Sequence, residues 1–168
     1  SSATGATTFG TGNTASGFVS LAMGGSNVSS GQLSLTVGTA NTASGIGSIS
    51  FGGGNNTAAN YSLIATGIEN TTVAAALYSI VGGQNNTQRG KAGVVFGTGN
   101  TLGTASSAGT VFGTGNTANA NSSTVFGGSN SATGEISFIA GSGSTASGTT
   151  YITLGRRNVY SGLFSVGD

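Results

Sequence analysis

The sequence predicts an all-β fold, a parallel β-solenoid of about 14-residue coils, in one domain that spans residues 1–168. Three observations carry this prediction. A glycine recurs every 14 to 16 residues along most of the chain, an apolar residue usually precedes it, and an asparagine usually stands three residues after it. The segment TVFGTGN at 110–116 has all three features, and TVFGGSN at 124–130 repeats them fourteen residues later.

The recurring glycines divide the chain into about 11 to 12 coils. We place them at Gly10, Gly24, Gly38, Gly52, Gly67, Gly82, Gly97, Gly113, Gly127, Gly141, Gly155 and Gly167. The residue before the glycine is apolar at 11 of these 12 positions, although hydrophobic residues make up only 36% of the chain. A disordered low-complexity chain would not keep its apolar residues in phase with a repeat, so we predict a folded solenoid.

Each coil is expected to contain one short β-strand that ends at the glycine. The positions one and three residues before the glycine are both rich in apolar residues, and residues two apart lie on the same face of a strand. We therefore expect these two columns to form the core. A helix is excluded, because each of its several glycines would cost about 1 kcal/mol relative to alanine. The expected core includes Phe9, Phe51, Phe96, Phe112 and Phe126.

The asparagine that follows each glycine is expected to build a corner of the coil. Glycine and asparagine tolerate left-handed backbone conformations, and the asparagine amide bonds locally to a turn. Stacked coils would place these amides about 4.8 Å apart, close enough for a hydrogen-bonded ladder. The corner residues are Asn13, Asn27, Asn41, Asn55, Asn70, Asn85, Asn100, Asn116, Asn130 and Asn158.

The position between the two expected core columns should point to the opposite side of the strand. In five consecutive coils it carries a β-branched apolar residue, and an exposed row of this kind would promote aggregation of a monomer. We therefore interpret the row as a possible subunit interface, with a solvent-facing strand of good β-propensity as the alternative. It consists of Ile80, Val95, Val111, Val125 and Ile139.

Short motifs within the coils resemble those of a known family. They are SLAMG (20–24), SLTVG (34–38), SISFG (48–52) and SFIAG (137–141), with NTASG (13–17 and 41–45) and STASG (144–148) filling the rest of a coil. Along essentially its whole length the chain thus resembles the head repeats of YadA-like trimeric autotransporter adhesins, and it is also similar to phage tail fibre repeats of the same type. The resemblance implies a left-handed β-roll, three copies of which pack around a threefold axis. The coils between Gly52 and Gly113 depart from the pattern, since they run to 15 or 16 residues.

The composition argues against enzymatic chemistry. The chain has four Lys and Arg, three Asp and Glu, and no histidine or cysteine, so it offers no activated nucleophile and no metal cluster. Glu69 and Glu135 fall on different parts of the coil more than four coils apart, roughly 20 Å at the strand spacing, too far to act as a pair. A net charge of +1 provides no basic field for nucleic acid. We expect no enzyme activity, no cofactor, no nucleic acid partner and no membrane insertion in this segment.

These features together predict a structural and adhesive fibre head at a cell or virion surface. It would be extracellular, would associate with copies of itself as a homotrimer, and would bind a receptor, matrix or glycan surface through many weak contacts. The alternative is a self-assembling extracellular filament subunit, because open solenoid ends can template further coils.

One column and one segment suggest further roles. An ice-binding solenoid is a less favoured interpretation, because it would need an unbroken threonine row and the best column has threonine at six of eleven positions and is interrupted at five. That column reads Thr14, Val28, Thr42, Asn56, Thr71, Asn86, Thr101, Thr117, Ser131, Thr145 and Val159. The apolar run TTVAAALY at 71–78 predicts a bulge on the outer edge of the coil, or a packing element that helps to bind a partner.

Overall fold

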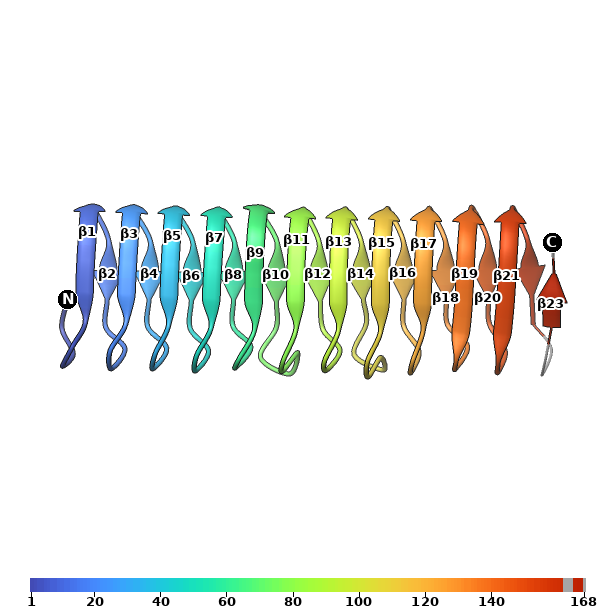
Figure 1. Cartoon of the computed structure of the whole chain (residues 1–168), viewed down its shortest axis with the longest axis horizontal. Helices are drawn as coiled ribbons and strands as arrows, with labels where there is room; N and C mark the ends of the chain where they lie inside the picture. Colours follow the sequence, from blue (N-terminus) through green and yellow to red (C-terminus); the bar gives the residue numbers. More distant parts are fainter. Residues whose placement is uncertain (162–164, 168) are drawn as a thin grey trace.

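The computed structural model describes residues 1–161 and 165–167, in which the chain winds into a straight rod of stacked coils (Figure 1). Each coil adds a strand to a wide sheet and a shorter strand to a narrow sheet, and neighbouring strands run parallel. The predicted parallel β-solenoid is therefore confirmed. The described ranges contain no helix, and therefore no helix that is long and apolar enough to cross a membrane.

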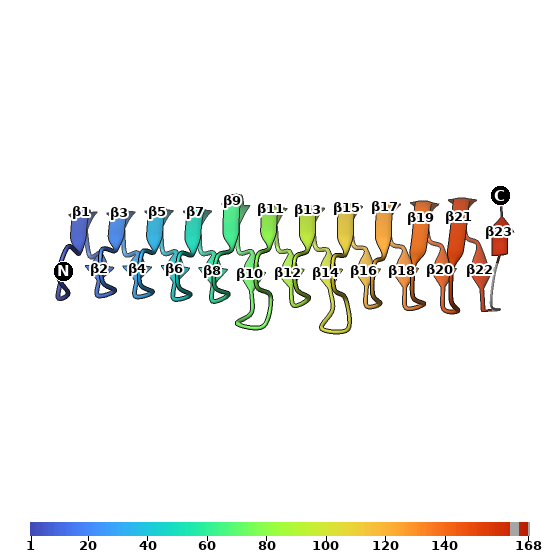
Figure 2. The ribbon, with the colours of Figure 1, turned by 60° about the horizontal axis from the view of Figure 1, so that its bottom comes forward.

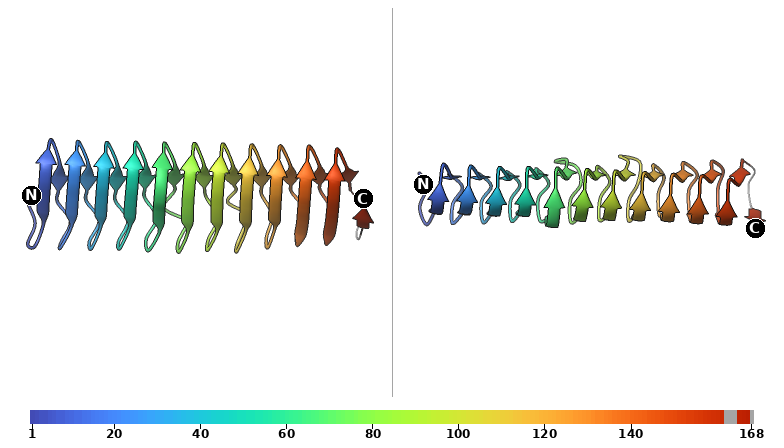
Figure 3. Two further views of the ribbon diagram at one scale, coloured as in Figure 1. Left: turned by 45° about the horizontal axis from the view of Figure 1, so that its top comes forward. Right: turned by 90° about the horizontal axis from the view of Figure 1, so that it is seen from above.

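The wide sheet has 12 strands and the narrow sheet has 11, each in sequence order along the rod. The wide strands are β1 (Thr7–Thr11), β3 (Leu21–Gly25), β5 (Leu35–Thr39), β7 (Ile49–Gly53), β9 (Leu63–Ile68), β11 (Ile80–Gln84), β13 (Val94–Thr98), β15 (Thr110–Thr114), β17 (Thr124–Gly128), β19 (Ser137–Ser142), β21 (Tyr151–Arg156) and β23 (Ser165–Gly167). The narrow strands are β2 (Thr14–Ala15), β4 (Val28–Ser29), β6 (Thr42–Ala43), β8 (Asn56–Thr57), β10 (Thr71–Thr72), β12 (Thr87–Gln88), β14 (Thr101–Leu102), β16 (Thr117–Ala118), β18 (Ser131–Ala132), β20 (Thr145–Ala146) and β22 (Val159–Tyr160). Seen from above, the two sheets face each other along the rod (Figure 3).

A glycine is required where each wide strand turns toward the narrow sheet. Gly97 has a φ of +124°, and a methyl group on its Cα would overlap the carbonyl oxygen of Gly113 in the next coil. Because this space stays empty, the amide of Asn100 reaches the same carbonyl and donates to it from Nδ2 at 2.7 Å. The glycine and the asparagine of the repeat thus serve one interaction between coils.

The predicted asparagine ladder is present and fills one side of the interior. Each Oδ1 accepts hydrogen bonds from the backbone N–H and from Nδ2 of the asparagine one coil further on, at 2.9–3.1 Å and 3.0–3.1 Å. After Asn130 the chain of bonds continues through Ser144 to Asn158. The members before it are Asn13, Asn27, Asn41, Asn55, Asn70, Asn86, Asn100 and Asn116.

The prediction was wrong at one corner, because Asn86 and not Asn85 belongs to the ladder. The sequence GGQNN at 82–86 permits two registers one residue apart, and the chain adopts the one in which Gly83 pairs with Gly67 and Gly97. This register directs Val81 into the core, where it is fully buried. The last glycine was also misplaced, since Gly167 pairs with Thr153 and not with Gly155.

The two sides of the wide strand are the reverse of the prediction. The expected core residues lie on the outer face, where Phe9 is 58% exposed, Phe112 37% and Phe126 38%. Phe51 and Phe96 are only half-buried. Of the expected interface residues, Val95, Val111, Val125 and Ile139 are fully buried inside the coil, whereas Ile80 stands on the outer face at 41% exposure.

Side-chain volume explains the reversal. The interior column between Ala22 and Thr153 contains only small or medium residues, among them Thr36 and Ser50, because the opposite sheet and the asparagine ladder lie close behind it. Where the narrow sheet contributes a large residue to the interior, the residue that faces it just before the wide strand is glycine. A methyl group at Gly93 would overlap both Gln88 and Leu102. A phenylalanine does not fit this space and must point outward.

Two coils have long loops that leave the coil at one corner, and β9 holds one further extra residue, Ala65, in a β-bulge opposite Val81 and Gly82. The segments after β10 and after β14 project beyond the shorter turns on either side (Figure 2). The first belongs to the run 71–78, of which Thr71 and Thr72 form β10 while Ala74 and Ala75 are exposed. Ala76 turns back into the core and is fully buried. The run is therefore a projecting loop with one packing residue.

The glycine requirement gives a matched pair of variants. Gly97→Ala should lower the free energy of unfolding by about 3 kcal/mol or more, because the new methyl group meets backbone on the next coil. Gly99→Ala should cost about 1 kcal/mol, since Gly99 also has a positive φ but no atom lies within 4 Å of its added Cβ. Urea unfolding followed by circular dichroism measures both, and equal losses would contradict the proposed role of Gly97.

Candidate assembly interface

The outer face of the wide sheet carries two continuous columns of side chains. We name the first the central column: Thr7, Leu21, Leu35, Ile49, Leu63, Ile80, Val94, Thr110, Thr124, Phe138 and Ile152. We name the second the phenylalanine column: Phe9, Met23, Val37, Phe51, Thr66, Gly82, Phe96, Phe112, Phe126, Ala140 and Leu154. The face is therefore apolar along almost its entire length.

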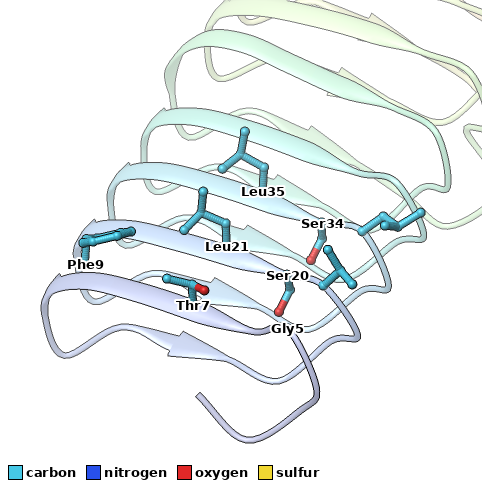
Figure 4. A pocket seen from close by; sticks show the side chains of 9 residues that line it. Gly5, Thr7, Phe9, Ser20, Leu21, Ser34 and Leu35 are labelled. Carbon is cyan, nitrogen blue, oxygen red and sulfur yellow. The ribbon is translucent and has the colours of Figure 1, made fainter.

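The strand period produces this face directly. Central and phenylalanine positions are two residues apart on each strand, so both side chains leave the same side of the sheet. At the first coils Thr7, Leu21 and Leu35 stand in a row with Phe9 beside them (Figure 4). Ser20 and Ser34, one residue before their strands, are buried in the coil.

Aromatic rings stack along part of the phenylalanine column. Phe96 and Phe112 have ring centroids 5.6 Å apart and planes within 9°, and Phe112 and Phe126 are 5.4 Å apart with planes within 8°. The strand register places these three residues directly above one another in consecutive coils. The rings form a ridge that remains partly open to solvent.

No charged residue occurs in either column. The described charges lie elsewhere on the coil, with Glu69 at the corner beyond the wide strand and Arg89 and Lys91 at the turn that follows β12. Among the described residues no three His, Cys, Asp or Glu side chains form a group that could hold a metal ion. The outer face is consequently suited to contacts with another apolar surface.

The narrow sheet presents a different outer surface. With Asn86 in the ladder, Thr87 takes its place in the threonine column, so Thr71, Thr87, Thr101 and Thr117 are adjacent in consecutive strands. Threonine then occupies seven of the eleven positions, one more than predicted. Val28, Asn56, Ser131 and Val159 interrupt the row.

No protein-family model matches the chain, and no curated protein is significantly similar to it. The class of molecule is therefore defined by the structure, as a two-sheet parallel β-solenoid with a polar interior corner and an apolar outer face.

Both rows of the wide strand are evident in the sequence, but their predicted roles are the reverse of those in the structure. The usable signal was residue size, because the buried column contains only Ala, Ser, Thr, Val and Ile, whereas all the phenylalanines of the strands stand outside it. Thr87 and the exposed residues at the turns before the wide strands were not predicted as surface residues of interest.

The exchange of faces can be tested with one substitution at two adjacent positions. Val111→Asn should lower the free energy of unfolding by about 3 kcal/mol, because it places an amide in a fully buried apolar site. Phe112→Asn should cost about 1 kcal/mol, from the loss of stacking on Phe96 and Phe126. Urea unfolding at a concentration where single chains prevail makes the comparison, and a larger loss for Phe112→Asn would refute the assignment.

Proposed function

We propose that the protein is a structural, adhesive fibre head, an extracellular rod that associates side by side with copies of itself. The observation that carries the proposal is the uncharged apolar outer face, which runs the length of the described wide sheet. A soluble monomer rarely exposes a continuous apolar patch of this extent. A second surface of the same chemistry is the simplest cover for it.

The size of the face supports a stable association. Eleven coils at the strand spacing extend roughly 50 Å, and the columns together are roughly 15 Å wide, which gives about 750 Å² for each copy. Standard protein interfaces bury about 800 Å² on each partner. The face is thus large enough for a specific oligomer and too large to be left exposed.

A homotrimer follows from the resemblance to trimeric adhesin heads. Three rods around a common axis would turn their wide sheets inward and leave the narrow sheets and corners facing solvent. Those surfaces repeat every coil and on every chain, so weak contacts to a receptor, matrix or glycan would add up by avidity. Such an assembly belongs at the outer surface of a cell or virion and requires no catalysis or cofactor.

The mass of the protein in solution tests this proposal. We expect a trimer of three 16.0 kDa chains whose mass is independent of protein concentration. Light scattering after size exclusion gives the mass, and Phe96→Ser with Phe126→Ser should shift it toward the single chain because two rings of the ridge are lost. Thr101→Ser with Thr117→Ser, on the narrow sheet, is the matched control and should leave it unchanged.

Other measured masses in solution would distinguish the alternatives. Polymers that grow with concentration would support the alternative of a filament subunit joined end to end. A single chain at all concentrations would refute both the trimer and the filament.

A second candidate function rests on the adjacent threonines of the narrow sheet. Four consecutive strands present Thr71, Thr87, Thr101 and Thr117 in one row, with hydroxyl and methyl groups repeated at about the strand spacing. An ice-binding solenoid needs a regular threonine row, and these four adjacent positions form an uninterrupted stretch of one.

Thermal hysteresis in dilute solution tests the ice-binding candidate. The candidate predicts a measurable hysteresis gap that Thr87→Tyr with Thr101→Tyr removes, because two large rings break the evenness of the row. Thr7→Tyr, on the opposite sheet, should keep the gap. Absence of hysteresis in the unmodified protein would exclude this function.

A further inference from the structure

A third column of side chains borders the outer face and has an unusual backbone. The residue two positions before each central residue has a positive φ in every coil from the first to the eleventh. We name these residues the corner column: Gly5, Val19, Leu33, Gly47, Tyr61, Tyr78, Ala92, Ala108, Ser122, Ile136 and Thr150. Their φ values lie between 49° and 71°. This region strongly favours glycine and asparagine over β-branched and bulky residues.

The opposite corner of the coil provides an internal comparison. There too a positive φ occurs in every coil, at Gly12, Ser26, Ala40, Gly54, Glu69, Asn85, Gly99, Gly115, Ser129, Gly143 and Arg157. This far corner contains no Val, Leu, Ile, Phe or Tyr. Among the residues that the structure describes, large apolar side chains in the strained conformation occur only where the corner borders the apolar face.

These large residues stay exposed in the single chain, although the rings of Tyr61 and Tyr78 stack on each other with centroids 5.6 Å apart. Their exposed fractions are 46% for Val19, 54% for Leu33, 57% for Tyr61, 63% for Tyr78 and 58% for Ile136. The backbone is held in place, since the N–H of Leu33 donates to the Phe18 carbonyl at 2.9 Å and the same bond recurs at the other corners. Backbone strain of this kind persists at functional positions.

The corner and central columns enclose open grooves at both ends of the rod. At the first coils a groove of about 480 Å³ is lined by Val19, Leu33, Leu21, Leu35 and Phe9, among others. Near the last coils a second groove, of about 230 Å³, is lined by residues that include Ile136, Phe138 and Ile152. The corner column therefore widens the apolar face and makes its surface grooved.

Residue sizes in the corner and phenylalanine columns are complementary, coil by coil. Every coil with a phenylalanine in the phenylalanine column has a small corner: Phe9 with Gly5, Phe51 with Gly47, Phe96 with Ala92, Phe112 with Ala108, and Phe126 with Ser122. Every coil with a large apolar corner lacks that phenylalanine: Val19 with Met23, Leu33 with Val37, Tyr61 with Thr66, Tyr78 with Gly82, and Ile136 with Ala140.

Contacts between the two columns of one coil do not account for this match, although within the chain a side chain of the next coil covers Gly5, Gly47 and Gly82. Corner and phenylalanine residues of one coil are four positions apart along extended backbone, about 13 Å, and the central side chain stands between them. Cyclic packing of parallel rods, in contrast, places the phenylalanine edge of each face against the corner edge of its neighbour at the same height. Antiparallel packing would set corner against corner at different heights.

We propose that the copies assemble as parallel rods in register, with the phenylalanine column of each chain packed against the corner column of the next chain, coil by coil. This inference rests on the proposed side-by-side association and specifies its partner surface, direction and register. The strained corner residues are then interface residues, and the alternation of large and small side chains fixes the register.

Disulfide trapping tests the direction and the register, because the chain has no cysteine. The double variant Ala108→Cys, Phe112→Cys should form covalent oligomers under mild oxidation. Its two cysteines are too far apart to bond within one chain, since a disulfide needs Cα atoms within about 7 Å. The double variant Phe51→Cys, Phe112→Cys is the matched control and should remain unlinked, although antiparallel rods would bring these two positions together.

A size exchange tests the contact itself. Ala108→Phe should raise the dissociation constant roughly tenfold or more, since it opposes two rings at one height. Ala108→Phe combined with Phe112→Ala should return the constant to within about threefold of the original. Ser129→Phe controls for strain, because Ser129 and Ala108 are both exposed and have φ values of 56° and 58°. It should leave the association unchanged.

The outcomes separate the two proposals. Cross-linking of Phe51→Cys, Phe112→Cys would overturn the parallel arrangement. An oligomer that neither pair links, or that Ala108→Phe leaves intact, would overturn the in-register contact while side-by-side association stands. A protein that is a single chain at all concentrations would overturn both.

Discussion

The buried asparagine ladder is the interaction on which the rest of the molecule depends. Each amide bonds to the asparagines above and below it and to a glycine carbonyl of the next coil, so all its hydrogen-bonding groups are engaged without water. An unpaired buried amide would be costly, which makes a slip of one residue between coils unfavourable. The ladder thereby sets the register of both sheets, and it excludes every residue except glycine from the point where the strand turns.

The ladder also determines how the apolar residues are distributed. Asparagines and small side chains occupy the interior, so the largest apolar groups have no place inside and collect on the outer face. The result is a chain whose most hydrophobic surface is external, and the proposed side-by-side association would cover that surface. The corner column adds to this external apolar surface, because its large residues are exposed in the single chain and line grooves together with the central column.

Much of this architecture could be predicted from the sequence, and the failures have physical causes. Periodicity predicted the strands, all but two of the glycine turns and all but one of the ladder asparagines, because stacking forces equivalent residues into equivalent places. Alternation cannot say which side of a strand is inside, and hydrophobicity chose the wrong side since Phe112 is more apolar than the buried Val111. At 82–86 two registers satisfied the pattern equally, and only the packing of Val81 distinguishes them. The corner column was invisible, because backbone conformation is not evident from side-chain chemistry.

The two projecting loops show where a coil can change in length. Insertions after β10 and β14 leave the ladder and both sheets unbroken, because the next strand rejoins its column after the extra residues. Evolution can therefore lengthen this corner in any coil without disturbing the rod. The same property makes the corner a natural place to graft a foreign peptide, which the solenoid would then display at a chosen position along its length.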